Sequence, residues 1–238
     1  MELALLDRAW PTLAENLAVD EALLLAAEGG GPEVLRFWEW PTTAVVLGAG
    51  GILAADVDEV ACERDQVEIQ RRSSGGGTVL LGRGCLCFSL ILSFDRDPAL
   101  RHVNPSYRWI LDRFSRALAP IADLRMNGIC DLVVAGRKCG GNAQQRKRTH
   151  LLHHGTLLYD FELELASRYL RMPDRQPEYR AHRTHAEFLL NLPVTAAVLR
   201  DRLITEWQAT IGTFPDIEGR TDEVLKNRYQ QADWVRRR

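Results

Sequence analysis

The chain has 238 residues, 46% of them hydrophobic, which is enough apolar material for the core of one large domain. It carries 30 basic and 32 acidic residues, for a formal net charge of −2. This near balance argues against a general nucleic-acid-binding protein, because such proteins carry a basic excess.

The first predicted element is a helix over residues 15–28, where Leu17, Leu24 and Leu25 recur at helical spacing and the glycines at 29–31 end the run. Pro41 ends the first strand. The elements predicted up to residue 92 are, in chain order, strands at 34–40 and 44–51, a short helix at 57–65, and extended segments at 67–74 and 78–92.

The second half of the chain continues with an amphipathic helix at 105–119 and a strand, turn and strand over 130–145. It ends with a strand at 150–161, a helix at 162–171, a loop at 172–185 and a helix at 194–211. Hairpin-like strand pairs outnumber strand–helix–strand alternations. We therefore expect one α/β (α+β) domain over residues 1–238, with an antiparallel or mixed sheet flanked by helices.

The five cysteines are odd in number and form no C-x-x-C pair, so neither a disulfide framework nor a zinc ribbon is indicated. Reduced thiols in a cytoplasmic protein are expected. The residues after Met1 lack the basic start and apolar run of a secretory signal. No stretch approaches the roughly 18 apolar residues that span a bilayer.

The stretch AVVLGAGG at 44–51 resembles the start of a dinucleotide-binding fingerprint, with a strand running into G-x-G. The third glycine of that fingerprint would fall at position 53, where Leu53 stands. A turn at the end of a strand is the better interpretation.

The stretch RRSSGGGT at 71–78 places three consecutive glycines beside two arginines. Adjacent glycines expose backbone N–H groups with no Cβ in the way, and such a nest holds an anion. Arg71 and Arg72 alternate faces in a strand, so at most one of them should point into the same site. A glycine-rich hairpin with exposed arginines is the alternative.

The stretch GRKCGGNAQ at 136–144 carries Lys138 before a second pair of glycines, and HHGT follows at 153–156. A lysine, glycines, an amide and imidazoles within twenty residues fit the second wall of an anion site. A basic surface hairpin, or a loop that binds nucleic acid, fits the same spacing.

Together these segments resemble the lipoate–protein ligase A family, within the larger group of biotin/lipoate ligases and lipoyl or octanoyl transferases. Members carry runs similar to R-R-S-S-G-G-G-A-V, D-L-V-V, R-K-V-S-G-S-A and H-H-G-T-L-L, in that order. The corresponding runs here are RRSSGGGTV at 71–79, DLVV at 131–134, RKCGGNA at 137–143 and HHGTLL at 153–158. The resemblance covers roughly residues 14–172 and implies a biotin/lipoate ligase-like catalytic core.

The resemblance implies an enzyme that activates lipoate or octanoate with ATP and Mg²⁺ as an acyl-adenylate. The acyl group then passes to a lysine of a lipoyl-acceptor protein, such as a lipoyl domain or a glycine-cleavage H-like protein. Backbone N–H groups and fixed cations suit this task, because charge builds up on oxygen atoms as pyrophosphate leaves. Neither a nucleic acid nor a membrane is an expected partner.

Carried over residue by residue, the resemblance gives Lys138 the central catalytic place, in contact with the acyl carbonyl and the phosphate. Asp131 would help to position the nucleotide or a metal ion whose ligands are not specified. The residues expected to line the acyl-adenylate are Arg72, Ser74, Gly75, Gly76 and Gly77, with further pocket positions at Asn142, Ala143 and His154. The strands around Trp38, Val45 and Val79 would form the acyl slot or serve as ordinary core.

The chain departs from the family pattern in several places. Leu80 and Leu81 replace polar residues after the glycines, Gln145 replaces an arginine next to Arg146, and Cys139 replaces an isoleucine or valine. Some ligases also carry a C-terminal accessory domain, for which no room is expected here. Either it is dispensable, or a separate chain supplies it, or the chemistry stops at acyl transfer.

Two other functions therefore remain open. Octanoyl and lipoyl transferases hold the acyl group on a cysteine as a thioester and need no ATP, and Cys130 and Cys139 are the candidates here. A thiol beside Lys138 would have a lowered pKa, although adjacent strand residues face opposite ways. A non-catalytic lipoyl-binding module is the third interpretation.

Overall fold

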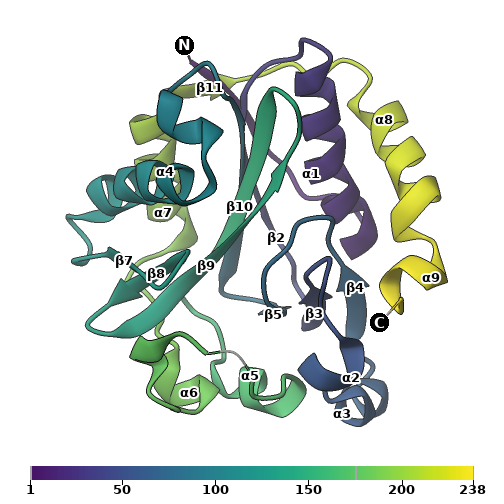
Figure 1. Cartoon of the computed structure of the whole chain (residues 1–238), viewed down its shortest axis with the longest axis vertical. Helices are drawn as coiled ribbons and strands as arrows, with labels where there is room; N and C mark the ends of the chain where they lie inside the picture. Colours follow the sequence, from purple (N-terminus) through teal and green to yellow (C-terminus); the bar gives the residue numbers. More distant parts are fainter. Residues whose placement is uncertain (1, 175, 238) are drawn as a thin grey trace.

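The computed structural model describes residues 2–174 and 176–237, so Arg175 of the predicted 172–185 loop lies outside the described residues. A large twisted sheet runs through the molecule, with helices on both of its faces and a small sheet beside one of them (Figure 1). The large sheet has the strand order β11-β1-β2-β6-β10-β9-β8-β7, and the small sheet has the order β4-β3-β5.

Eleven strands are defined within the described residues. They are β1 (Leu3–Asp7), β2 (Val34–Glu39), β3 (Ala44–Leu47), β4 (Glu68–Arg71), β5 (Val79–Leu81), β6 (Cys85–Ser93), β7 (Arg125–Asn127), β8 (Asp131–Val134), β9 (Arg137–Arg146), β10 (His150–Leu158) and β11 (Ala209–Ile211). The α-helices are α1 (Leu13–Glu28), α2 (Leu53–Asp56), α3 (Glu59–Arg64), α4 (Val103–Leu118), α5 (Glu164–Tyr169), α6 (His185–Phe188), α7 (Ala196–Trp207), α8 (Ile217–Val224) and α9 (Ala232–Val235).

The large sheet is mixed. Strands β11, β1 and β2 pair in parallel, whereas β2, β6, β10, β9, β8 and β7 pair antiparallel in succession. The small sheet pairs β3 in parallel with β4 and antiparallel with β5. The predicted fold class, a single α/β domain with a mixed sheet between helices, is confirmed.

The alternation of side chains along β2 and β6 divides the core between the two faces of the large sheet. Leu35 and Phe37 of β2 pack with α4 and α7, whereas Val34 and Trp38 pack with α1 and the small sheet. This is the period of two that a strand imposes on its side chains. It also turns Arg36, the residue between them, toward α1, where the guanidinium is completely buried.

Several predicted boundaries were wrong. The segment 78–92 is two strands in different sheets, because the chain turns at Gly82–Gly84 between β5 and β6. The last predicted helix ends at Trp207, since Gln208 adopts a left-handed conformation and the chain then enters β11. Strands β1 and β7 and helices α2, α6, α8 and α9 were not predicted. Of these, β7, α2, α6 and α9 have only three or four residues, too few for a periodic pattern to stand out.

Across residues 2–174 and 176–237, no helix combines the length and the apolar character that a crossing of a membrane requires.

Replacing Gly84 by alanine is expected to destabilise the fold. Gly84 has a φ of +81°, and an added Cβ would lie 2.0 Å from the main-chain carbon of Asp160. We expect a loss of at least about 2 kcal/mol in the free energy of unfolding, because backbone strain and a clash with main chain add together. Urea denaturation would measure it. Gly50→Ala is the control, since its Cβ would meet nothing within 4 Å; equal stabilities of the two variants would contradict the prediction.

Candidate acyl-transfer site

The glycine loop, residues 72–78 between β4 and β5, is folded around the guanidinium of Arg72. The Nε of Arg72 donates to Ser74 Oγ at 2.9 Å, and its Nη2 donates to the carbonyls of Gly75 and Gly77 at 2.7 and 2.9 Å. A weaker bond of 3.3 Å joins Nη1 to the carbonyl of Val46. Arg72 therefore organises the loop and has most of its N–H groups engaged.

With these carbonyls turned toward Arg72, the amide N–H groups of the loop are left for a ligand. Within the part of the chain that the structure describes, the amides of Gly75, Gly76 and Gly77 have no hydrogen-bond partner. Gly76 has a φ of +88°, a conformation that alternates with its neighbours in anion-binding nests. An anion-binding nest in this loop stays a prediction, which the unpartnered amides and the φ of Gly76 favour.

The first glycine of AVVLGAGG serves this loop and no dinucleotide site. Gly48 ends β3, and a Cβ there would lie 2.0 Å from the carbonyl oxygen of Gly76. Arg71 stabilises the turn at residues 48–51 by donating to the carbonyls of Gly48 and Gly51 at 2.9 and 2.7 Å. The two arginines thus take different directions, as the strand alternation predicts.

Lys138 on β9 reaches the same cavity from the other side. Its Nζ forms an ion pair with Asp131 Oδ1 at 2.7 Å, and the Lys138 side chain is 26% exposed. The register between β8 and β9 shifts at Leu132 and Val133. Gly141 makes room for the lysine, because a Cβ on it would lie 2.8 Å from Nζ.

Asp131 is the anchor of that lysine. Its second oxygen accepts a hydrogen bond from the hydroxyl of Tyr179 at 2.7 Å. Burial and the neighbouring carboxylate raise the pKa of Tyr179, so the phenol stays protonated and remains a donor. The loop before α6 is thereby tied to the Lys138–Asp131 pair.

Lys138 lies where two cavities meet. The first has a volume of about 170 Å³ and the second about 260 Å³. Both are lined by Lys138, Asp131 and Gly77. The two sequence motifs, some sixty residues apart, therefore form the walls of one continuous cleft.

The two cavities differ in character. The inner wall of the first is largely apolar and is made by Leu17, Trp38, Val46, Val79, Leu81 and Phe88. The second cavity adds basic groups to apolar ones and includes Arg171, Arg180 and His185. Of the residues proposed for an acyl slot, Trp38 and Val79 line the first cavity, whereas Val45 belongs to the core.

The remaining predicted pocket residues also lie at the first cavity. Asn142, Ala143 and His154 line it, and the amide of Asn142 donates to the carbonyl of Cys130 at 2.7 Å. His154 contacts Ser74, with 2.6 Å between Nε2 and Oγ. His153, its neighbour in sequence, points to the opposite face, where burial lowers its pKa to about 3 and keeps it neutral.

The departures from the family pattern have structural counterparts. Gln145 accepts a hydrogen bond from Ser73 at 2.6 Å and so joins the two motifs directly. Arg146 does not take the place of the missing arginine, since it turns to Ser106 and Gln144 at the other side of β9. Leu80 and Leu81 are buried in the core beside the cleft.

The two cysteines next to the motifs, Cys130 and Cys139, differ in their surroundings. Cys139 is completely buried in the core cluster that includes residues of α4, and burial raises its pKa to about 12, so the thiol is protonated at neutral pH. Cys130 lines the first cavity. Its pKa is also raised, by burial and then by Asp131, although Lys138 and Arg72 act in the opposite direction.

No cluster of three or more His, Cys, Asp or Glu side chains suited to a metal ion occurs among residues 2–174 and 176–237. The carboxylates that line the second cavity are Asp56 and Asp131. Mg²⁺ is usually held by one or two carboxylates together with substrate phosphates, so the donor set fits Mg²⁺ carried in by a nucleotide and does not form a preformed cage.

Comparison with known proteins assigns the family. Residues 12–206 match the model of the lipoyl protein ligase A/B catalytic domain. The chain belongs to this family. Its members named below divide between ligases and octanoyltransferases, so the protein is an enzyme of lipoyl or octanoyl protein modification.

The curated relatives show this division. A probable lipoate-protein ligase A of Mycoplasma pneumoniae is 30% identical over 158 residues, which are 66% of this chain and 45% of that protein. The octanoyltransferase LipM of Geobacillus kaustophilus is also 30% identical, over 203 residues that cover 75% of this chain and 73% of the relative. The chain thus spans less than half the length of the first of these relatives.

Solved structures share the fold. A putative lipoate protein ligase of Thermoplasma acidophilum with bound lipoic acid superposes with a TM-score of 0.84 at 22% identity, covering 99% of this chain and 100% of the other. A lipoate-protein ligase A bound with ATP gives 0.84 at 21% identity, with 99% of each chain covered. A bipartite lipoate protein ligase, described with its E2 lipoyl domain and also from T. acidophilum, gives 0.85 at 22% identity, with 99% and 96% covered.

Gly141→Ala is expected to displace Lys138 while keeping the fold. The added Cβ would overlap the end of a flexible side chain, so the lysine should swing away from Asp131. We expect the unfolding free energy to change by about 1 kcal/mol or less and the Nζ–Oδ1 contact to be lost in a crystal structure of the variant. Gly77→Ala, whose Cβ would meet nothing within 4 Å, should leave the pair intact. An unmoved Lys138 in Gly141→Ala would contradict this prediction.

Proposed function

We propose that this protein is an ATP-dependent lipoate–protein ligase, which activates lipoate or octanoate as acyl-AMP and passes the acyl group to a lysine of a lipoyl-acceptor domain. The observation that carries the proposal is the position of Lys138, at the junction of an apolar cavity and a cavity lined by basic side chains. An acyl-adenylate has this polarity, with a hydrocarbon arm on one side of the mixed anhydride and a nucleotide on the other.

The first cavity suits the acyl arm. Its walls of leucine, valine and aromatic side chains offer burial for a hydrocarbon chain, at about 0.8 kcal/mol for each CH₂ removed from water. The carboxylate end then lies toward Lys138 and the glycine loop. Trp38, Leu81 and Phe88 come from three different strands, so the slot is built on the rigid part of the fold.

The second cavity suits the nucleotide. In the first step a carboxylate oxygen of the acid attacks the α-phosphorus of ATP, and the bond to pyrophosphate breaks. Gly77 and Lys138 line both cavities and Gly76 lines the first, so we expect their amide and ammonium groups to stabilise the charge on the oxygens involved. Arg171 and Arg180 extend this basic wall, whereas burial lowers the pKa of His185, so its ring is neutral at neutral pH. Mg²⁺, held by the phosphates with Asp56, would neutralise further charge, since both oxygens of Asp131 are engaged by Lys138 and Tyr179.

In the second step, the amine of the acceptor lysine attacks the acyl carbonyl, AMP leaves, and the amine releases its proton. Lys138 is held by Asp131 as a fixed cation, and it can remain in contact with the carbonyl and phosphate oxygens through both steps. A preorganised charge of this kind stabilises a transition state without the cost of reorienting solvent.

A second candidate function is acyl transfer through a cysteine thioester, and the position of Cys130 favours it. The thiol lines the first cavity beside Lys138 and Arg72, and relatives named octanoyltransferase are as similar to this chain as a ligase is. Burial raises the pKa of Cys130, which lowers its reactivity in this state. We therefore place this function second.

The expected partner is a lipoyl domain or an H-like protein that offers an acceptor lysine. Because a ligase of T. acidophilum is described as bipartite, an accessory chain is part of the proposal for this protein as well. We also propose that residues 1–238 act as one catalytic domain. A lipoyl-binding module without turnover is the remaining alternative, and the assay below separates it from the enzymes.

The first test mixes the protein with lipoate and a lipoyl domain, with and without ATP and Mg²⁺. We expect acylation of the domain, measured by mass spectrometry, to depend on ATP. Octanoate should serve as an alternative substrate. Acylation from an octanoyl thioester in the absence of ATP would show that the protein is a transferase and not a ligase. Retention of lipoate with no turnover under either condition would indicate a binding module.

Lys138→Ala should abolish acylation, with a loss of at least about 10²-fold in kcat/KM, because a preorganised cation at the reacting centre is removed. Lys147→Ala is the matched control, since that residue lies in the β9–β10 turn, outside both cavities. Circular dichroism checks that both variants fold. A Lys138→Ala variant with activity within about twofold of the wild type would refute the role of this lysine.

Cys130→Ser separates the two candidate functions. In a ligase the change should reduce ATP-dependent acylation by no more than about fivefold, because the hydroxyl keeps the shape of the cavity wall. In a transferase the same change removes the nucleophile and abolishes transfer. Detection of an acyl group on Cys130 of the wild-type protein by mass spectrometry would identify the transferase.

A further inference from the structure

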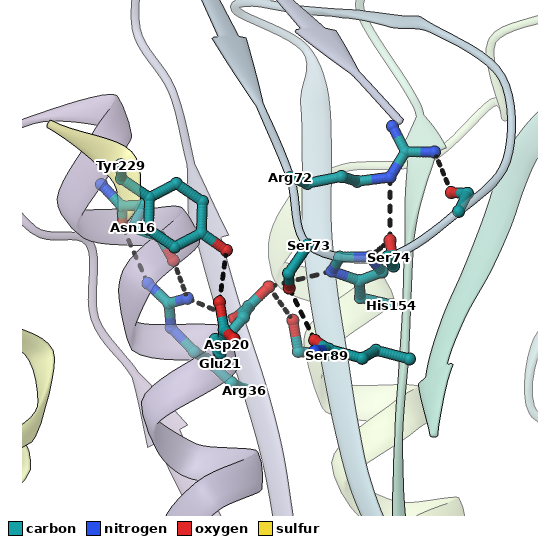
Figure 2. Close-up of polar contacts among 12 residues, drawn as sticks. Asn16, Asp20, Glu21, Arg36, Arg72, Ser73, Ser74, Ser89, His154 and Tyr229 are labelled. Carbon is teal, nitrogen blue, oxygen red and sulfur yellow. Dashed lines mark hydrogen bonds and ion pairs between the residues drawn. The ribbon is translucent and has the colours of Figure 1, made fainter. Parts of the chain in front are cut away.

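Asp20 lies behind the glycine loop, on a helix that no motif marks as functional. It is 2% exposed, and it lines the inner end of the first cavity together with Arg72 and His154. Figure 2 shows it at the centre of a chain of polar contacts that runs from α1 to the loop. Buried polar groups carry a desolvation cost, and such a chain lowers that cost only if every member finds its partner.

Both carboxylate oxygens of Asp20 have polar partners. Oδ1 accepts from Nη1 of Arg36 at 2.5 Å, while Oδ2 accepts from the hydroxyl of Ser89 at 2.8 Å and lies 3.1 Å from Nδ1 of His154. Burial by itself would raise the pKa of Asp20, but Arg36 and His154 hold it below the ordinary value. The side chain is therefore a carboxylate, which accepts hydrogen bonds and donates none.

This fixes the tautomer of His154. Since Asp20 can only accept, Nδ1 of His154 must carry a proton. In the neutral ring Nε2 is then an acceptor, and its partner, 2.6 Å away, is the hydroxyl of Ser74. The proton of Ser74 points to the ring, so its oxygen is free to accept the Nε–H of Arg72 at 2.9 Å.

From Ser74 the chain of contacts continues into the loop. The same guanidinium holds the carbonyls of Gly75 and Gly77, and the amides of these two glycines have no partner among the described residues. The orientation of the amides thus depends, through Arg72, Ser74 and His154, on a carboxylate of α1.

We propose that Asp20 is a positioning residue of the acyl-transfer site, which sets the tautomer of His154 and, through Ser74 and Arg72, the orientation of the glycine loop opposite Lys138. The inference rests on the proposed function for its kinetic consequence, but the tautomer itself can be measured independently of any activity.

The order Asp–His–Ser is also that of serine hydrolases, yet the surroundings of Ser74 do not suit a nucleophile. Its oxygen already accepts from Arg72, and the residue is 1% exposed. Ser74 therefore transmits orientation to the loop and does not receive an acyl group.

The first test is spectroscopic. In ¹⁵N-labelled wild-type protein, long-range ¹H–¹⁵N correlation at a pH where the ring is neutral should show His154 protonated at Nδ1. In Asp20→Asn, an amide N–H should face Nδ1 and move the ring proton to Nε2. Arg36 keeps the main-chain oxygen and Oδ1 of Asn16 as acceptors, each at 2.8 Å, which favours a folded variant. A wild-type ring protonated at Nε2 alone, or a tautomer unchanged in the variant, would overturn the proposal.

The second test is kinetic and uses ATP-dependent acylation of a lipoyl domain. Asp20→Asn should lower kcat by about tenfold or more, with KM for lipoate changed by less than about threefold, because loop orientation acts on the reacting phosphate and not on the acyl arm. Ser89→Ala is the matched control. It removes another hydrogen bond from the same carboxylate oxygen, leaves the contact with His154 in place, and should stay within about twofold of wild type.

An Asp20→Asn variant with wild-type kcat, or a Ser89→Ala variant as slow as Asp20→Asn, would refute the positioning role. If the wild type shows no ATP-dependent acylation at all, the proposed function fails while the tautomer measurement still tests the contact chain. If the wild type is active and the tautomer is the opposite one, the proposed function stands and this inference falls.

Discussion

The buried guanidinium of Arg72 is the constraint on which the site depends. Burial lowers its pKa to about 10, so the group stays charged at neutral pH, yet its partners are a hydroxyl and three backbone carbonyls. The nearby carboxylates are already committed, Asp20 to Arg36 and Asp131 to Lys138. A buried cation with only neutral partners leaves a positive potential in the cavity, and an anion bound at the glycine loop would offset it.

The same guanidinium also explains why the glycines are needed. Two loop carbonyls have to turn inward within three residues, and this forces Gly76 to a φ of +88° and brings its oxygen against Gly48. Side chains at these positions would strain the backbone or collide with it. On the facing wall, Gly141 leaves room for Lys138, so small residues on both walls shape the cleft around charged side chains.

Much of the secondary structure and part of the site were predictable from the sequence, because they depend on local patterns of residues. The helix at 15–28, the alternating strands at 34–40 and 150–161, and the glycine nest follow from periodicity and from the conformational freedom of glycine. The spacing around Lys138 suggested a second wall of an anion site and left a basic surface hairpin as the alternative, and the family resemblance was needed to join that segment to the glycine loop. The turn at Gly82–Gly84 was missed because the apolar run on both sides of it conceals the change of sheet.

The contacts that local patterns could not indicate are those between distant residues. Asp20 meets His154 across 134 positions and Tyr179 meets Asp131 across 48, and neither pair has a spacing that a single sequence exposes. Arg36 could have given a signal, because a charged residue inside an otherwise apolar strand requires a buried partner. The alternation of side chains along β2 directs Arg36 toward α1, and this helix carries the acidic residues Asp20 and Glu21. A buried charge in a central strand is thus a sequence-level reason to look for an acidic residue on the helix that covers it.

The named relatives divide between ligases and octanoyltransferases, and the two functions proposed for the cleft follow the same division. Both reactions need an acyl slot, a fixed cation at the carbonyl and a place for the departing group. In the proposed ligase that place would hold AMP, which the arginines of the second cavity suit; in a transferase the group that leaves in the second step would be the Cys130 thiolate, at the first cavity. Lys138 lines both cavities, so in either proposed reaction it would lie beside the acyl carbonyl. The raised pKa of Cys130 and the arginines that line the second cavity are the reasons for proposing the ligase first.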